Sequence, residues 1–198
     1  MDTVIKAGTG VIKRPKPLAR ALRRTQADYL VVPGGWRFAD AVRRAQEELG
    51  FSNDTAHWAA IAAMDQTGLV LAELLDLKAT PYPEARAVLL PYRWLEREDP
   101  LPRSWKATSD SISVWIASRL GAGTVVAVKD VPGVILDGRP VDAVKASEIK
   151  GRETAVDPLA PELAERYDVE IRVVPNDDPN NITAAVEGED FVGTRILP

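Results

Sequence analysis

The sequence predicts an α/β fold, a three-layer αβα sandwich whose central sheet is mostly parallel. Short apolar runs typical of strands alternate with amphipathic helical segments along the chain. Residues 124–128 lack polar alternation after Thr124, as expected of a strand covered on both faces of a parallel sheet. Because the 198 residues contain no repeat, low-complexity tract or linker, we expect a single domain over residues 1–198.

The first half of the chain alternates as this class requires. Strands are expected over residues 3–6, 29–32 and 87–90, and helices over residues 15–24, 36–49 and 54–76. Ala7-Gly8-Thr9-Gly10 is expected to be a flexible loop after the first strand. Residues 92–106 are charged and rich in proline, which predicts a loop over the edge of the site.

Residues 101–134 form the central stretch of the predicted fold, with a helix followed by a buried strand. Thr108 and Ser109 suit the N-cap of a helix, and Asp110 falls in its first turn, where the helix dipole favours an anion. Gly121 suits the positive φ that ends such a helix. Lys129 and Asp130 then leave the strand over residues 124–128 at its carboxyl end, the edge where open α/β sheets bind ligands.

The last third continues the alternation. We expect a hairpin over residues 134–141, an irregular polar segment over 147–157, helices over 158–167 and 179–187, and strands over 170–174 and 193–197.

Composition excludes several classes of protein. A net charge of −4 argues against a general nucleic-acid binder. The absence of cysteine removes disulfides, thiolate zinc sites and a cysteine nucleophile, and a single histidine removes a histidine-rich metal site. No apolar run reaches about 18 residues, so no membrane span is expected. The N-terminus lacks a secretory apolar segment, so we expect a cytoplasmic protein.

Gly34 and Gly35 stand between a predicted strand and a predicted helix. This order can point free backbone N–H groups at an anion, and we expect a positive φ at Gly35. A plain turn explains a Gly-Gly pair equally well.

Five short motifs follow in one order along nearly the whole chain. They are Lys6-Ala7-Gly8-Thr9-Gly10, Pro33-Gly34-Gly35, Thr108-Ser109-Asp110, Lys129-Asp130-Val131-Pro132-Gly133, and Pro179-Asn180-Asn181-Ile182 with Gly193-Thr194. Neither glycine loop matches the Walker or the dinucleotide fingerprint. As an ordered set, however, the five resemble the amino acid kinase superfamily.

The resemblance implies a carbamate kinase-like fold and an ATP- and Mg²⁺-dependent kinase that forms no covalent enzyme intermediate. It implies catalytic roles for Lys6 and Asp110, whose alternative readings are an exposed lysine and a helix-end carboxylate. The nucleotide would be bound by Gly8, Thr9, Gly10, Lys129, Asp130 and Gly133. Asp130 is the one candidate to touch Mg²⁺, and a turn-capping aspartate is its alternative reading.

The acceptor would be bound by Gly34, Gly35, Asp40, His57, Trp105 and Thr108. Asp40 and Asp65 could pair with a substrate ammonium or be ordinary helix surface charges. His57 could hold an acceptor phosphate or be a buried structural histidine. Trp105 could stack on an aromatic ring or simply pack.

Within the superfamily, the chain is similar to small archaeal kinases described as aspartokinase-related. This group includes a kinase of methanofuran biosynthesis that phosphorylates [5-(aminomethyl)furan-3-yl]methyl phosphate, and it implies a small-molecule acceptor and a homodimer or larger assembly. A carboxylate kinase, an isopentenyl-phosphate kinase and a non-catalytic molybdate-type oxyanion store or sensor remain alternatives.

The chain departs from the superfamily pattern at two places. Thr9 and Gly10 stand where relatives have Gly and Ser. Residues 154–158 lack a lysine that many relatives carry there, and Lys129 stands where many have threonine. We expect Lys129 to take over that missing charge.

Overall fold

A computed structural model describes residues 1–98 and 101–198. The first half of the chain forms β1 (Thr3–Ala7), α1 (Thr9–Lys13), α2 (Lys16–Arg24), β2 (Tyr29–Pro33), α3 (Trp36–Leu49), α4 (Asn53–Leu75), β3 (Lys78–Thr80), β4 (Ala87–Leu89) and α5 (Tyr92–Glu98). The second half forms α6 (Ser109–Leu120), β5 (Thr124–Lys129), β6 (Ile135–Leu136), β7 (Arg139–Pro140), β8 (Ala143–Lys145), α7 (Ala146–Ile149), α8 (Ala160–Tyr167), β9 (Glu170–Pro175), α9 (Pro179–Glu187) and β10 (Thr194–Leu197).

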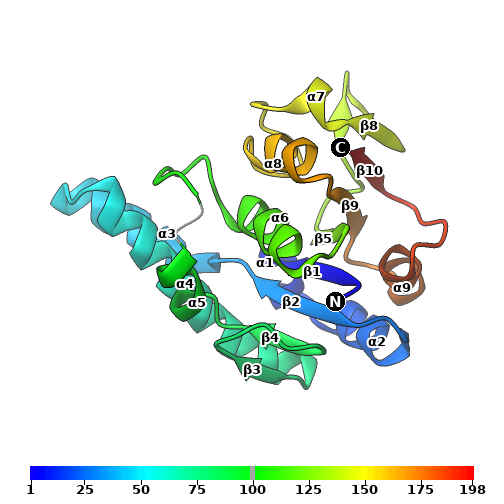
Figure 1. The fold of residues 1–198 in the computed structure, drawn as a ribbon, viewed down its shortest axis with the longest axis horizontal. Coiled ribbons are helices and arrows are strands. Elements are labelled where there is room, and N and C mark those ends of the chain that lie inside the picture. Colours follow the sequence, from blue (N-terminus) through cyan, green and yellow to red (C-terminus); the bar gives the residue numbers. More distant parts are fainter. Residues whose placement is uncertain (99–100) are drawn as a thin grey trace.

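A central sheet runs through the molecule in the order β3-β4-β2-β1-β5-β9-β10-β8 (Figure 1). Among its described strand pairs, only β9 and β10 run antiparallel. β1 lies between β2 and β5, with Ala7 opposite Pro33 and Val128. The predicted mostly parallel α/β sheet is therefore confirmed, and the ends of β1, β2 and β5 lie at one edge.

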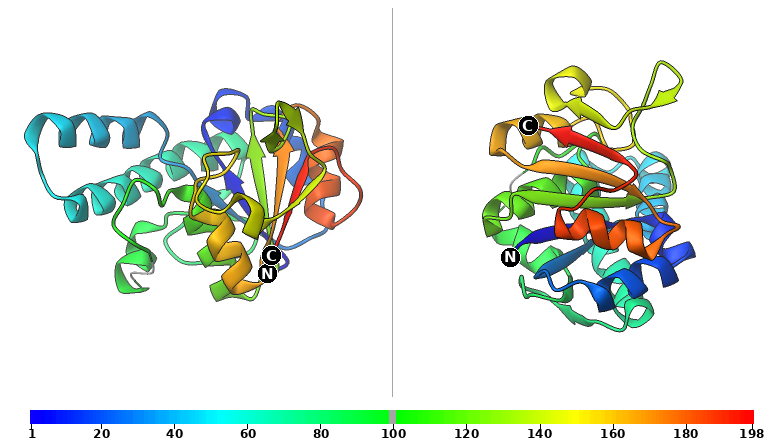
Figure 2. Two further views of the ribbon diagram at one scale, coloured as in Figure 1. Left: turned by 90° about the horizontal axis from the view of Figure 1, so that it is seen from above. Right: turned by 90° about the vertical axis from the view of Figure 1, so that its right-hand side faces the viewer.

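Two apolar cores lie on opposite faces of the sheet. Val4 of β1 belongs to the core under α6 and α8, while its neighbour Ile5 belongs to the core under α1, α2 and α9. Successive strand residues point to opposite faces, so one five-residue strand contributes to both cores. Figure 2 shows helices on both sides of the sheet, as the predicted αβα sandwich requires.

α3 and the first half of α4 project from the sandwich as an antiparallel pair (Figure 2, left). Gly50 ends α3 with φ +69, and Ser52 caps α4 by accepting a hydrogen bond from the Thr55 N–H. None of the residues of α3, all of which are described, is buried. The pair forms an arm beside the carboxyl edge of β1 and β2.

α4 is the one described helix long and apolar enough, by length and composition, to span a membrane. Core helices of globular proteins meet the same criterion. Its residues Met64, Leu71 and Leu75 are buried in the two cores of the fold, as expected of a helix packed on the sheet.

Two predicted loops are wrong in part. Thr9 begins α1 directly after Gly8, because burial of Val11 and Ile12 favours a helical turn over a flexible loop. Residues 92–98 form α5, in which Leu95 is fully buried. Residues 99 and 100 of that predicted loop lie outside the described residues. Among shorter elements, β3, β8 and α7 were not expected, because three- or four-residue segments carry little periodicity.

Candidate active site

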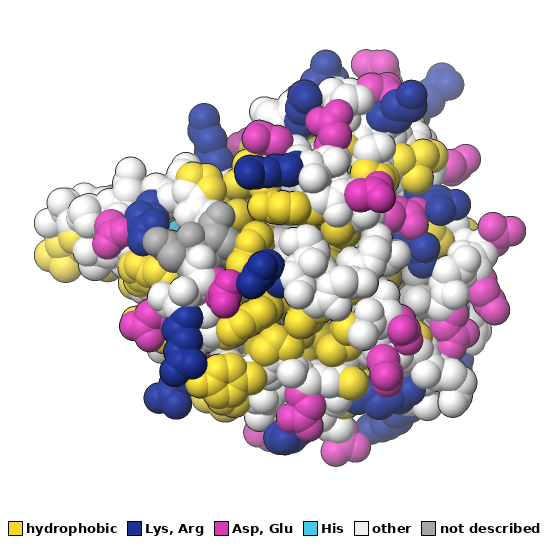
Figure 3. Space-filling model, viewed as in Figure 1, with side chains coloured by type: hydrophobic (Ala, Val, Ile, Leu, Met, Phe, Trp, Pro, Cys, Tyr) yellow, Lys and Arg dark blue, Asp and Glu magenta, His cyan; other side chains and the backbone are white. Residues whose placement is uncertain are grey.

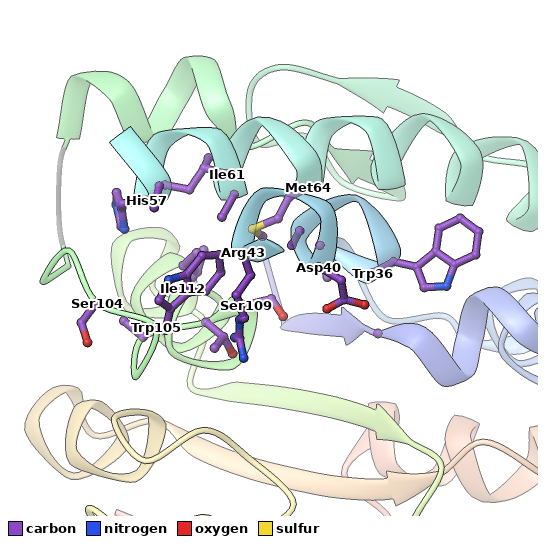
Figure 4. Close-up of a pocket in the computed structure, with 18 of the residues that line it drawn as sticks. Trp36, Asp40, Arg43, His57, Ile61, Met64, Ser104, Trp105, Ser109 and Ile112 are labelled. Atoms are coloured by element: carbon purple, nitrogen blue, oxygen red, sulfur yellow. The ribbon is translucent and has the colours of Figure 1, made fainter. Parts of the chain in front are cut away.

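A cleft opens between the α3–α4 arm and the start of α6, at the carboxyl edge of the sheet (Figure 4). It encloses about 930 Å³, counting space open to solvent. The side chains from the arm include Asp40 and His57, and those from the opposite wall include Trp105 and Ile112. Of the predicted site residues, those lining it are Lys6, Gly8, Thr9, Gly34, Gly35, Asp40, His57, Trp105 and Thr108.

Three charged side chains meet beside this cleft. Lys129 Nζ lies 2.8 Å from both carboxylate oxygens of Asp110, and Lys6 Nζ lies 3.1 Å from Asp110 Oδ1. All three are largely buried, with side-chain exposures of 8% for Lys6, 9% for Asp110 and 15% for Lys129. β1, α6 and β5 each supply one group, so the sheet register brings them together.

This arrangement shifts the protonation of the cluster. Burial alone would raise the pKa of the Asp110 carboxyl, but Lys129 and Lys6 together hold that pKa well below its usual range. Burial lowers the pKa of Lys129 to about 8; Asp110 opposes this fall and Lys6 adds to it. The cluster of one carboxylate and two lysines therefore has a net positive charge, which attracts an anion.

Asp157, which the sequence analysis did not single out, ties this cluster to two helices. Its carboxylate accepts hydrogen bonds from the N–H groups of Ser111, 2.9 Å away, and of Ala160, 2.8 Å away, in the first turns of α6 and α8. Its own N–H donates to Asp110 Oδ2 at 3.1 Å. The Thr108 hydroxyl donates to Asp157 at 2.8 Å, so Asp157 caps α6 in place of the expected Thr108 side chain. The sequence feature that could have indicated Asp157 is an Asp-Pro pair just before a predicted helix.

The two predicted glycine turns lie against each other. The Gly34 N–H donates to the Ala7 carbonyl at 2.8 Å, and a Cβ on Gly34 would lie 3.4 Å from Gly8 Cα. A Cβ on Gly8 would lie 2.8 Å from Lys6 Nζ. Side chains here would therefore fill the space between the lysine and the turns.

The start of α3 has an unusual backbone conformation. Gly35 is right-handed, with φ −83, and the positive φ expected there falls on Trp36, with φ +47. A bulky residue rarely adopts this conformation, and such outliers gather at functional sites. A right-handed residue followed by a left-handed one turns successive N–H groups toward one point, which forms an anion-binding nest. A Cβ on Gly35 would clash with Ala39 Cβ at 2.4 Å.

Asp130 does not line the cleft and lies against the start of α1. Its carboxylate occupies the space where Gly10 lacks a side chain, and it accepts a hydrogen bond from Arg14 at 3.2 Å. Both side chains are about half exposed. Arg14 was not predicted, because an arginine after a glycine turn carries no distinctive pattern. Asn176 holds this region together by donating to the carbonyls of Gly10 and Arg14.

The described residues contain no group of three or more side chains able to hold a metal ion. Mg²⁺ is commonly bound through one or two carboxylates plus substrate phosphates and water. Asp130, half exposed at the sheet edge, fits the single carboxylate of such a site.

Two further predicted residues have structural contacts of their own. A Cβ on Gly133 would lie 2.4 Å from Thr194 Oγ1, so its missing side chain permits close packing with β10. Asp65 accepts a hydrogen bond from the Tyr92 N–H at 3.0 Å, and burial raises its pKa while that bond opposes the rise. Asp65 does not line the cleft, whereas Asp40 does.

Solved structures similar to this one include several kinases, whereas no family model matches the sequence. Uridylate kinase from Archaeoglobus fulgidus aligns over 100% of both chains with a TM-score of 0.72 and 21% identity. UMP kinase from Bacillus anthracis aligns over 99% of this chain and 95% of that one, with a TM-score of 0.69 and 17% identity. Aspartate kinase from Synechocystis has a TM-score of 0.69 at 15% identity, and this chain covers 40% of it. These likenesses establish the fold.

Curated relatives then give the family. [5-(Aminomethyl)furan-3-yl]methyl phosphate kinase from Methanocaldococcus jannaschii is 32% identical over 98% of this chain and 97% of its own length. Uridylate kinase from Haloarcula marismortui is 28% identical over 85% of this chain and 82% of its own length. The chain belongs to the amino acid kinase superfamily and is an ATP-dependent phosphotransferase.

The contacts of Asp157 predict a large effect on folding. Replacing Asp157 with alanine leaves buried N–H groups of α6 and α8 without an acceptor, so the free energy of unfolding should fall by about 3 kcal/mol in urea titrations. Glu153→Ala, at an exposed position in the same segment, is the control and should change it by less than about 0.5 kcal/mol. Equal stability of the two variants would contradict the assigned role.

Proposed function

We propose that the chain transfers the γ-phosphoryl group of ATP to a phosphate-monoester acceptor, and that the acceptor is [5-(aminomethyl)furan-3-yl]methyl phosphate. The observation that carries the reaction type is the pair of buried lysines sharing Asp110 where two glycine turns meet. The similarity to the Methanocaldococcus kinase supports the acceptor.

Phosphoryl transfer depends on positioning and on positive groups near the equatorial oxygens of the moving phosphoryl group. Lys6 and Lys129 would supply that charge. Lys6 lines the cleft, and Lys129 is bound to Asp110 beside it. Asp110 binds both ammonium groups and offsets the repulsion between them. Lys129 would thereby supply the charge of the lysine missing from residues 154–158.

The glycine turns would separate the two substrates. Gly8, Thr9 and Gly10, at the start of α1, would hold the ATP phosphates with Lys129, Asp130 and Gly133 at the neighbouring strand end. The nest at Gly35 and Trp36, which follows Gly34, would hold the acceptor phosphate. ATP brings the phosphoryl group and Mg²⁺ would neutralise its charge, with Asp130 as the protein carboxylate nearest to it.

The rest of the cleft suits an acceptor with a ring and an amine. Ile61, Met64 and Ile112 give an apolar lining, as ligand sites usually have. Asp40 adds one carboxylate that can pair with an aminomethyl cation. His57 and Thr108 border the same space.

The function is tested by measuring ATP consumption with candidate acceptors: the furan phosphate, isopentenyl phosphate, aspartate and UMP. We expect the highest kcat/KM with the furan phosphate. Lys6→Ala should lower kcat by about 100-fold or more with little change in ATP affinity, because the lost charge acts mainly in the transition state. Lys13→Ala, at an exposed position on α1, is the matched control.

Other outcomes of this assay identify other functions. A preference for isopentenyl phosphate or aspartate would replace the proposed acceptor and keep the kinase site. Tight molybdate binding without transfer to any acceptor would favour an oxyanion store. Lys6→Ala with near-normal kcat would refute the role of Lys6.

The pKa of Lys129 predicts an alkaline limit to activity. Lys129 is charged below a pKa of about 8 and loses its proton above it, so kcat/KM should fall as pH rises through about 8 in the free enzyme. Lys129→Arg keeps the charge at higher pH and should move the fall upward. An unchanged alkaline limb in Lys129→Arg would assign it to another group.

We also propose that this cytoplasmic enzyme is a homodimer or larger, with α4 at or near the interface. Leu69 and Leu74 of α4 are 57% and 40% exposed. Figure 3 shows further hydrophobic side chains gathered on one face of the molecule, between α6 and β4. Burying such surface is favourable in association.

Light scattering at micromolar concentration should give at least twice the mass of one chain. Leu69→Lys should weaken the assembly, and Leu49→Lys, at the exposed end of α3, should not. A strictly monomeric wild type would contradict the proposal.

A further inference from the structure

The segment over residues 101–107 joins the two walls of the acceptor cleft. The indole N–H of Trp105 donates to Gln46 Oε1 on α3 at 2.8 Å. Arg103, two residues earlier, forms an ion pair with Asp54 at the start of α4. Figure 4 shows Trp105 and Arg43 close together at the cleft.

Two contacts fix the orientation of the Trp105 ring. Gln46 binds its nitrogen, and the Arg43 guanidinium lies 4.5 Å from the ring centroid. A cation over the face of an indole is attracted by its π electrons. Trp105 remains partly exposed and lines the cleft, so the rest of its surface is available to a bound molecule.

Gln46 is itself held in place. Its Nε2 donates to the Phe51 carbonyl at 3.2 Å and to Asn53 Oδ1 at 2.9 Å, in the turn between α3 and α4. The position of the indole is therefore set by the turn of the arm rather than by its own loop alone.

We propose that Gln46 and Arg43 are positioning residues that hold Trp105 as a stacking platform, so that the cleft selects acceptors containing a planar unsaturated ring. The inference rests on the proposed function, since it assigns the acceptor to this cleft. Stacking on an aromatic side chain contributes enough to binding to discriminate a flat ring from a puckered one of the same size.

The experiment compares the furan phosphate with its saturated oxolane analogue, which keeps the size, phosphate and amine. Calorimetry without ATP gives the Kd of each, and steady-state kinetics gives KM and kcat. Wild type should prefer the furan by about tenfold in Kd. Trp105→Leu should remove that preference by raising the Kd and KM for the furan phosphate toward the values for the oxolane analogue.

Three further variants test how Trp105 is positioned. Trp105→Phe keeps an aromatic ring but loses the N–H to Gln46, so it should retain only part of the preference. Gln46→Glu keeps an oxygen for the indole N–H but loses the donations to the turn, so it should lower the furan-to-oxolane ratio by less than Gln46→Leu does. Gln46→Leu removes both and should resemble Trp105→Phe.

The outcomes are distinct. If wild type uses the furan phosphate and Trp105→Leu keeps the preference, the stacking role is wrong and the proposed function stands. If Gln46→Leu keeps the full preference, the positioning role of Gln46 is wrong. If wild type binds neither the furan phosphate nor UMP, the acceptor assignment and the platform are both overturned. Thermal unfolding of each variant must match wild type for these comparisons.

Discussion

The buried carboxylate of Asp110 is the group on which the rest of the site depends. Two lysines this close would repel each other strongly in a medium of low dielectric, and the carboxylate between them makes their burial tolerable. The contact also joins β1, α6 and β5, so the charged cluster and the packing of the sheet support each other. Asp157 extends this support to α8 through the N–H it donates to Asp110.

Much of the scaffold could be predicted because its signals are local. Gly121 ends a helix where positive φ was expected, and the apolar run after Thr124 is a central parallel strand. Short elements were not predicted because they depend on contacts with distant parts of the sequence. Thr9–Lys13 is helical because its apolar residues pack in a core formed by such distant segments.

The candidate site was harder to predict, because its contacts join residues far apart in the chain. A motif can place Lys6 and Lys129 at strand ends, but only the sheet register shows that they share one carboxylate. Asp157 looked like part of an irregular segment, and its importance lies in bonds to a helix 46 residues earlier. Arg43 and Gln46 looked like surface polar residues of an amphipathic helix, and nothing nearby in sequence marks their contacts with Trp105.

The lack of burial along α3 has a consequence for how acceptor choice can change. Core positions tolerate few substitutions, because a change of one methylene group is felt by close-packed neighbours. α3 carries one wall of the cleft on a helix with no buried residue among its fourteen, so substitutions there cost little folding free energy. The strand ends that we propose to hold the nucleotide, by contrast, follow residues of the apolar cores, such as Ala7 and Val128. Substitutions on α3 can therefore change which acceptor binds. Substitutions at the strand ends are restricted, because they would also disturb folding.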